Sequence, residues 1–315
     1  MFPINWISQA AGRIAPHIQR TSVTLDAVRG WYFKWENQQV TGSFKVRGAL
    51  NKVLALESWE QARGLVTASA GNHGQGLAFA GRLVGAPVKV FVSDTAVEKK
   101  IRAMRALGAE VELVPGGYEQ AEAAGIRHAA LEGKTWVSAY NDAHVISGQG
   151  TVGLELAAEL ELDETFSVIL PASGGGLAAG VAAALSALPR RPRVVAAQPQ
   201  ASAFLYALYN GGTQAGVVES PTLADGLTGA VESGSLTIPM VRQYLDDFYL
   251  VDEQALIRAV AFAWTEYGQV IEPSAAVGLA VLMEGRVPAP AVVVISGGNI
   301  ETARHAQLVA EGAQR

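Results

Sequence analysis

Three glycine-rich turns in this 315-residue chain carry side chains and backbone groups that could bind a ligand. Each turn follows a short run of β-branched and small apolar residues, which predicts a buried strand. In open parallel sheets, ligands bind at the carboxyl ends of strands, where the N-termini of the following helices also point. We therefore expect one binding site bordered by Ser69–Gly76 (SAGNHGQG), Ser173–Leu177 (SGGGL) and Ser296–Asn299 (SGGN).

The second turn is suited to a phosphate group. Ser173–Leu177 opens a predicted helix, so consecutive backbone N–H groups would lie beside the positive end of the helix dipole. The turn lacks the Lys-Ser/Thr ending of a nucleotide-binding P-loop. Gln198 ends the next predicted strand, where a dinucleotide site would place an acid on the ribose. A phosphorylated ligand smaller than a dinucleotide is favoured, and a dinucleotide is the alternative.

One of the seven lysines stands in surroundings that differ from those of the others. Lys45 is flanked by Phe44 and Val46 at the point where a helix is predicted to begin. A partly buried lysine has a lowered pKa and can act as a nucleophile or Schiff-base partner. An ordinary lysine at a helix start is the alternative. Most of the other lysines stand among polar neighbours and are expected to be solvated.

Composition excludes several classes of protein. The 29 acidic and 24 basic residues are spread along the chain, which argues against a nucleic-acid surface. The chain has no cysteine, so disulfides, thiolate nucleophiles and Cys-based metal sites are excluded. It has no apolar run long enough to span a membrane. Polar residues interrupt positions 1–15, so we expect no signal peptide there and a cytoplasmic protein.

The elements expected to position these turns alternate along the chain, which predicts an α/β protein with a buried parallel sheet and helices on both faces. The predicted strands are 64–69, 87–93, 110–114, 135–140, 166–170, 193–197 and 291–295. The predicted helices are 72–84, 97–107, 118–131, 177–188, 204–209, 238–245, 253–267, 275–284 and 300–310.

Taken in order, the motifs resemble those of the pyridoxal-phosphate (PLP) enzymes of the tryptophan-synthase-β fold, fold type II. The similarity is to the threonine/serine dehydratase and serine racemase branch, and it covers residues 14–305. Besides the three glycine-rich turns, the similarity rests on a motif that precedes them, GSFKVRG at residues 42–48. It is supported by GQGT, ADG and IEPS at residues 148–151, 224–226 and 271–274.

This resemblance implies two open, twisted, mostly parallel sheets with helices on both faces. The cofactor would lie between a large domain (residues 1–52 and 144–315) and a small mobile domain (residues 53–143). It also implies a homodimer that acts on a small amino-acid substrate, without nucleic-acid or membrane partners.

Roles follow from the resemblance residue by residue. Lys45 would carry PLP covalently and later remove the substrate Cα proton, and Phe44 would pack beside the ring. Asn72 would bind the ring hydroxyl, and Ser296 would face the pyridine nitrogen. The phosphate would lie on Ser173, Gly174, Gly175, Gly176 and Leu177, and the substrate carboxylate on Ser69, Gly71, Asn72 and His73. We expect His73 to help through its backbone, with its ring merely packed.

The implied reaction is dehydration and deamination of a hydroxy amino acid, L-threonine or L-serine, to a 2-oxo acid and ammonia. A neutral hydroxyl at Ser296 cannot hold the pyridine nitrogen protonated as an aspartate would. The ring is then a weaker electron sink, which favours β-elimination over transamination. The alternatives are a serine racemase, a hydroxyaspartate dehydratase and a β-replacement synthase of the same fold.

Two positions depart from the pattern of relatives. Racemases of the family use a serine directly before Gly-Asn-His as a second acid or base, and Ala70 stands there in this chain. Many relatives bind a divalent cation through a glutamate and an aspartate where this chain has Gln198 and Phe204. Because hard cations prefer anionic oxygen ligands, we expect no metal site, unless Glu219 or Asp225 compensates.

Overall fold

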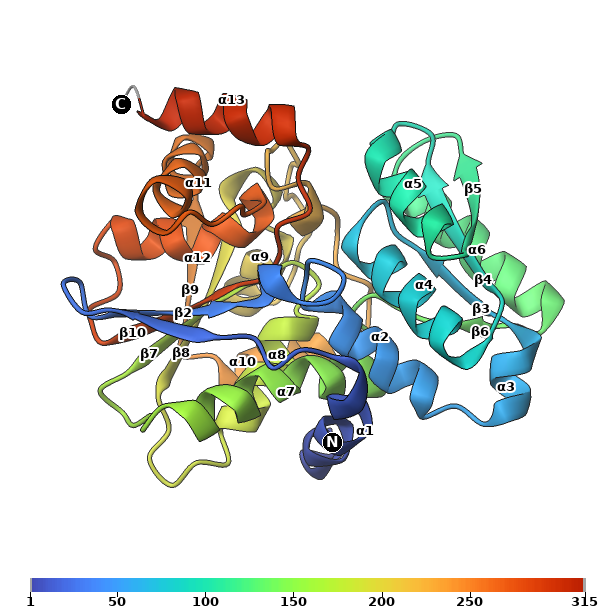
Figure 1. The fold of residues 1–315 in the computed structure, drawn as a ribbon, viewed down its shortest axis with the longest axis horizontal. Helices are drawn as coiled ribbons and strands as arrows, with labels where there is room; N and C mark the ends of the chain where they lie inside the picture. Colours follow the sequence, from blue (N-terminus) through green and yellow to red (C-terminus); the bar gives the residue numbers. More distant parts are fainter. Residues whose placement is uncertain (1, 314–315) are drawn as a thin grey trace.

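The computed structural model describes residues 2–313 and arranges the strands in two sheets, which Figure 1 shows side by side. The six-stranded sheet has the order β1-β2-β10-β7-β8-β9, and the four-stranded sheet has the order β5-β4-β3-β6. Every strand pair is parallel except β1 with β2. Two mostly parallel sheets confirm the fold class predicted from the alternating pattern. The strands are β1 (Val23–Asp26), β2 (Trp31–Trp35), β3 (Leu65–Ala68), β4 (Val88–Ser93), β5 (Glu110–Val114), β6 (Thr135–Trp136), β7 (Ser167–Pro171), β8 (Arg193–Pro199), β9 (Asp247–Val251) and β10 (Ala291–Ile295).

Helices cover both faces of each sheet. They are α1 (Asn5–Ile14), α2 (Lys45–Leu54), α3 (Ser58–Arg63), α4 (Asn72–Val84), α5 (Glu98–Ala106), α6 (Tyr118–Glu132), α7 (Ala143–Glu159), α8 (Gly176–Leu185), α9 (Phe204–Gly211), α10 (Thr237–Tyr244), α11 (Glu253–Tyr267), α12 (Pro273–Met283) and α13 (Thr302–Ala313). Four short 3-10 helices are η1 (Ala15–His17), η2 (Glu36–Gln38), η3 (Gln200–Ser202) and η4 (Asp225–Leu227).

The central strands of the six-stranded sheet are mostly apolar, because successive side chains point to opposite faces and helices cover both faces. In β10, Val293 and Ile295 pack with α11 and α12, whereas Val292 and Val294 pack with α7, α8 and α10. All four side chains are fully buried. The strands therefore read as continuous apolar runs rather than as alternating ones.

The four-stranded sheet is built in the same way from residues 65–136. Leu65 and Val90 pack against α4 and α5, and Val66 and Phe91 pack against α6 on the other face. Helix α2 contacts α4 of this layer and α7 of the larger one, so it lies between the two sheets. The helix that begins at Lys45 is thus held from both sides.

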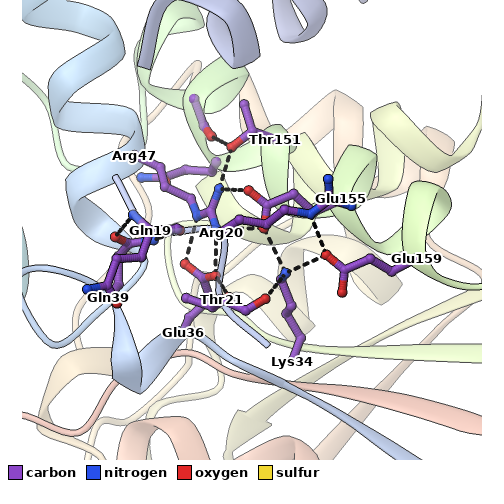
Figure 2. Close-up of polar contacts among 12 residues, drawn as sticks. Gln19, Arg20, Thr21, Lys34, Glu36, Gln39, Arg47, Thr151, Glu155 and Glu159 are labelled. Carbon is purple, nitrogen blue, oxygen red and sulfur yellow. Dashed lines mark hydrogen bonds and ion pairs between the residues drawn. The ribbon is translucent and has the colours of Figure 1, made fainter. Parts of the chain in front are cut away.

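A cluster of buried charges holds α2 against the six-stranded sheet, as Figure 2 shows. The guanidinium of Arg47 is fully buried and donates to both carboxylate oxygens of Glu36 (2.7 and 2.8 Å) and of Glu155 (2.7 and 2.9 Å). Lys34 of β2 is also fully buried and contacts Glu155 at 2.7 Å. Lys34 is therefore buried rather than solvated, because Glu155 supplies a carboxylate that the sequence flanking Lys34 does not reveal.

Two further differences concern the predicted elements. The strand expected over 135–140 stops after Trp136, and residues 137–142 form the segment before α7. The sequence prediction also lacked the antiparallel pair β1 and β2, the edge strand β9 and the helices α1, α3 and α7. Strand β1 is largely exposed, with Leu25 half in solvent, so its pattern carries little of the apolar signal of a buried strand.

Candidate active site

All three glycine-rich turns meet at one cavity of about 220 Å³. Its walls come from the carboxyl ends of β3, β7 and β10 and from the N-termini of α2, α4 and α8. Every site residue predicted from the sequence lines it. These residues are Phe44, Lys45, Ser69, Gly71, Asn72, His73, Ser173, Gly174, Gly175, Gly176, Leu177 and Ser296.

Lys45 is the first residue of α2, and its amine faces this cavity. Its Nζ donates to the carbonyl oxygen of Ala139 (3.0 Å) and lies 5.2 Å from the centre of the Phe44 ring. Burial lowers the pKa of Lys45 to about 8, against a smaller opposing effect of the Glu272 carboxylate. A substantial fraction of this amine is therefore neutral, and nucleophilic, near neutral pH.

Asn72, the first residue of α4, is fixed by two side-chain hydrogen bonds. Its Nδ2 donates to Glu272 Oε1 (2.6 Å), and its Oδ1 accepts from Asn299 Nδ2 (2.7 Å). These contacts set the amide orientation, because they place the donor and acceptor atoms on different partners. One N–H of Asn72 is left for a ligand in the cavity, as a ring hydroxyl or phenolate would require.

The Ser173–Leu177 turn leads into α8 in a conformation that depends on glycine. Gly175 has φ +87°, a left-handed conformation that side chains rarely adopt. A Cβ at Gly174 would collide with the ring of Tyr140. Thr237 Oγ1 donates to the carbonyl oxygen of Gly174 (2.6 Å), which holds this carbonyl away from the cavity. The turn thus forms a cradle of backbone N–H groups at a helix N-terminus, as an anion needs.

Ser296 directly follows β10 and is buried. Its carbonyl oxygen accepts a hydrogen bond from the backbone N–H of Phe44 (3.0 Å). This bond ties the third turn to the residue before Lys45. The hydroxyl of Ser296 and the amine of Lys45 therefore line the same cavity from neighbouring segments.

The remaining turn, Ser69–His73, presents backbone N–H groups at the N-terminus of α4. Ser69 Oγ accepts from the N–H of Gly71 (3.2 Å). The ring of His73 is buried, and its Nε2 is 3.1 Å from the carbonyl oxygen of Val137. Burial lowers the pKa of His73 to about 3, so the ring is neutral. This geometry agrees with a packed ring and leaves the backbone as the part of His73 that a carboxylate could use.

The sequence prediction gave no role to three features of the cavity. Glu272 is buried, and its burial raises the pKa of its carboxyl to about 7. The Tyr140 ring packs against the glycine turn. Lys100 of α5 reaches the carboxylate of Asp225 at 2.5 Å, so it is paired rather than solvated. Only Glu272 had a sequence signal, since it lies in the IEPS motif.

The side chains of Gln198, Glu219 and Asp225 all make contacts within the protein. Gln198 Oε1 accepts from the backbone N–H of Tyr206 (3.1 Å), and Glu219 accepts from Ser202 and Gly229 (both 2.7 Å). Asp225 is paired with Lys100. Within residues 2–313, no three His, Asp or Glu side chains are grouped as metal ligands. In the same part of the chain, no helix has the length and apolar character needed to cross a membrane.

An amine with a lowered pKa, a glycine turn suited to an anion, an amide donor and a neutral hydroxyl around one cavity fit a phosphorylated aldehyde cofactor. Residues 14–298 match the family described as pyridoxal-phosphate dependent enzyme, and the chain belongs to this family. It is therefore a PLP-dependent enzyme.

Similar proteins extend over almost the whole chain. The L-threonine ammonia-lyase of Thermotoga maritima is 36% identical and covers 96% of this chain and 76% of its own length. The catabolic L-threonine dehydratase of Escherichia coli is 33% identical and covers 97% of this chain and 95% of its own length. The solved structure of maize serine racemase has a TM-score of 0.89 at 32% identity and covers 99% of this chain and 98% of its own.

Proposed function

We propose that this enzyme is a threonine/serine ammonia-lyase, which converts L-threonine or L-serine to a 2-oxo acid and ammonia. The observation that carries the proposal is the Lys45 amine beside a phosphate cradle and a neutral Ser296, in a chain whose similar proteins include L-threonine ammonia-lyases. In this reaction the substrate loses its Cα proton and its β-hydroxyl. The released enamine tautomerises and is hydrolysed to the oxo acid and ammonia.

Each group of site residues has a separate role in this reaction. PLP, when bound, supplies the electron sink that acidifies the substrate Cα–H. Lys45 holds the cofactor and then accepts the Cα proton at its Nζ, for which its lowered pKa is suited. The 173–177 turn anchors the phosphate, and Asn72 donates to the ring oxygen. Backbone N–H groups of Ser69–His73 orient the substrate carboxylate at the N-terminus of α4.

Ser296 and Ala70 determine which reaction is favoured. A hydroxyl at Ser296 can hydrogen-bond the pyridine nitrogen without protonating it, so an electron pair at Cα is better relieved by loss of the β-hydroxyl. Ala70 lines the cavity but has no proton to give. Racemisation needs a second proton donor, so elimination is favoured over racemisation.

We further propose that residues 53–143 form a small mobile domain and that 1–52 with 144–315 form the large one. The separate four-stranded sheet within 65–136 supports this division. Closure would bring Ser69–His73 over the substrate. The family resemblance favours a homodimer that is located in the cytoplasm. Light scattering on the purified holoenzyme at several concentrations tests the dimer.

The decisive test replaces Lys45 with alanine. The wild-type holoenzyme should show the visible absorption of a lysine-bound cofactor and form a 2-oxo acid from threonine or serine. Lys45→Ala should lose this band and at least about 1,000-fold in kcat, because the removed group is both anchor and base. The control Lys52→Ala lies on the same helix and should keep both properties. A Lys45→Ala protein with wild-type activity would refute the proposal.

Substrate panels separate the alternatives. Serine, threonine and 3-hydroxyaspartate are compared by oxo-acid formation, and a chiral assay detects D-serine. Chelator treatment should leave activity unchanged. D-serine formed from L-serine as fast as pyruvate would identify a racemase instead.

A further inference from the structure

A second cavity, of about 280 Å³, lies apart from the candidate active site. Its walls come from α1, η1, the segment after η1 and α7, and it shares no lining residue with the cavity around Lys45. The proposed reaction uses none of its residues. Its volume is close to the lower end of the range for small-molecule sites, so it can accept a small organic molecule.

Most of this cavity is aliphatic. Ile14 and Ile18 line it from the N-terminal segment, and Leu154 lines it from α7, together with three alanines. An apolar group placed there would be removed from water, which stabilises binding in proportion to the area buried. A fully hydrated ion such as phosphate would gain nothing from these walls.

The polar side of the cavity is formed by Thr151, Glu155 and Arg20, and the first two have their hydrogen-bonding capacity taken up (Figure 2). Thr151 Oγ1 donates to the carbonyl oxygen of Gly148 and accepts from Arg47. Glu155 accepts from Arg47 through both oxygens and contacts Lys34. Because two cations already surround this carboxylate, it offers little attraction to a further one.

Arg20 is different, because part of its guanidinium is free. Its Nε donates to Glu159 Oε1 (2.7 Å), and its side chain is 58% exposed. Among the described residues, no acceptor is hydrogen-bonded to its two terminal nitrogens. Two N–H groups in a fixed planar fork match the two oxygens of a carboxylate. The cavity therefore combines an aliphatic interior with a free carboxylate-binding group at its edge.

We propose that this second cavity is a binding site for a small aliphatic monocarboxylate, with its carboxylate on Arg20 and its hydrocarbon part between α1 and α7. The ligand class follows from the two features together. An amine would meet the Arg20 charge, and an alcohol would leave the charged fork without a partner.

Isothermal titration calorimetry of the holoenzyme with 3-methylbutanoate tests this site, with acetate, 3-methylbutanol and 3-methylbutylamine as comparison ligands. A carboxylate could also bind at the N-terminus of α4, so variants decide where the heat comes from. Arg20→Gln removes the proposed partner. Ala158→Trp fills the cavity from an exposed position of α7. The matched control is Arg190→Gln, since Arg190 is an exposed arginine that also donates through Nε to a glutamate (2.6 Å).

We expect 3-methylbutanoate to bind more tightly than acetate, the alcohol and the amine. Arg20→Gln and Ala158→Trp should each weaken it by at least about tenfold, and Arg190→Gln should not change it. Equal affinity in wild type and Arg20→Gln would overturn the proposal, as would equal binding of the alcohol or amine. The proposal would also be overturned if 3-methylbutanoate, up to about 10 mM, gave no binding heat that is lost in Arg20→Gln. The same conclusion holds if a second copy of the chain covers this face and prevents binding.

Discussion

Burial shifts two ionisable groups of the cavity, Lys45 and Glu272, toward their neutral forms. The pKa of Lys45 falls to about 8 from 10.5, and that of Glu272 rises to about 7 from 4.5. For Glu272 the folded protein holds its proton more tightly than the unfolded chain does. Its contribution to stability is therefore complete below pH 4.5 and is lost as the pH rises to about 7. Both groups thus change charge in the range where the enzyme is expected to work.

Glu272→Gln should remove one titration step from the pH dependence of kcat/KM. In the wild type, kcat/KM should rise as the pH increases through about 7, because the ionised carboxylate is the stronger acceptor for Asn72. Glutamine keeps an acceptor oxygen but cannot ionise, so we expect a profile without this step and a loss of about tenfold above pH 7. Steady-state kinetics from pH 6 to 9 measure this, with Glu284→Gln as control. An unchanged step in Glu272→Gln would contradict the assignment.

Ala70→Ser tests the argument about the missing proton donor. The new hydroxyl would enter the cavity beside Gly71, where a second acid or base is needed for racemisation. We expect D-serine formation at least about tenfold above the wild-type level, while oxo-acid formation continues. Ala70→Gly is the matched control, since it adds no proton donor. No gain of D-serine would show that Ala70 does not decide between the two reactions.

Among single residues, the sequence could predict which side chains line the cavity where they stand in short motifs. Asn72 and Ser296 directly neighbour glycines, and Lys45 stands three residues from both Gly42 and Gly48, so the spacing is visible in the chain. Tyr140 and Lys100 were missed, since only the three-dimensional contact with Gly174 or Asp225 gives them a place at the cavity.

The elements that form the site depend on tight turns between strand and helix. Helix α8 begins at Gly176, one residue after the left-handed Gly175. The preceding strand, β7, is fully buried, so the turn cannot move outward to make room for a larger residue. The phosphate cradle is therefore a property of the β7–α8 unit rather than of any one side chain.

Gly174→Ala tests this unit. A methyl group there would meet the Tyr140 ring, so either the ring or the turn must shift. We expect the affinity of the apoenzyme for PLP to fall by at least about tenfold, measured by fluorescence titration. Gly211→Ala is the control, since a Cβ at this helical glycine meets nothing within 4 Å. Equal PLP affinity in Gly174→Ala and the wild type would contradict the cradle.

Elements were predictable where turn residues mark their ends. Glycines and polar residues flank α4 and β10, and both have the predicted bounds. The strand β2 (WYFKW) contains Lys34 as its fourth residue, and the burial of this lysine depends on Glu155 far along the chain. Helix α7 starts after an Asp142 cap, but its many buried glycines and polar residues hide the helical period. Such elements are set by tertiary contacts.

At the scale of the whole molecule, a few polar contacts connect the two sheets across the cavity. Lys100 reaches Asp225 (2.5 Å), Lys99 Nζ donates to the carbonyl oxygen of Ile300 (2.8 Å), and Asn72 contacts both Glu272 and Asn299. The residues that the four-stranded layer contributes to these contacts, Asn72, Lys99 and Lys100, come from α4 and α5. If the four-stranded layer moves, these are the contacts that must break.

Lys100→Met should make the closed arrangement less favourable. Because Asp225 is half exposed, the pair contributes at most about 1 kcal/mol, so KM should rise by no more than about fivefold with a smaller change in kcat. Lys89→Met is the matched control, since Lys89 is equally buried but pairs with Glu110 and Glu112 inside its own sheet. Stopped-flow binding and steady-state kinetics compare the two variants. A larger KM effect in Lys89→Met would contradict this role.

The pairing of β2 with β10 has a consequence for biosynthesis. Trp31 lies beside Ala291, which is synthesised 260 residues later. The four-stranded layer, by contrast, needs only residues 65–136 and can fold while the ribosome is still elongating the chain. Lys45 is therefore synthesised long before β10, and the proposed coenzyme site can form only after β10 has joined the six-stranded sheet.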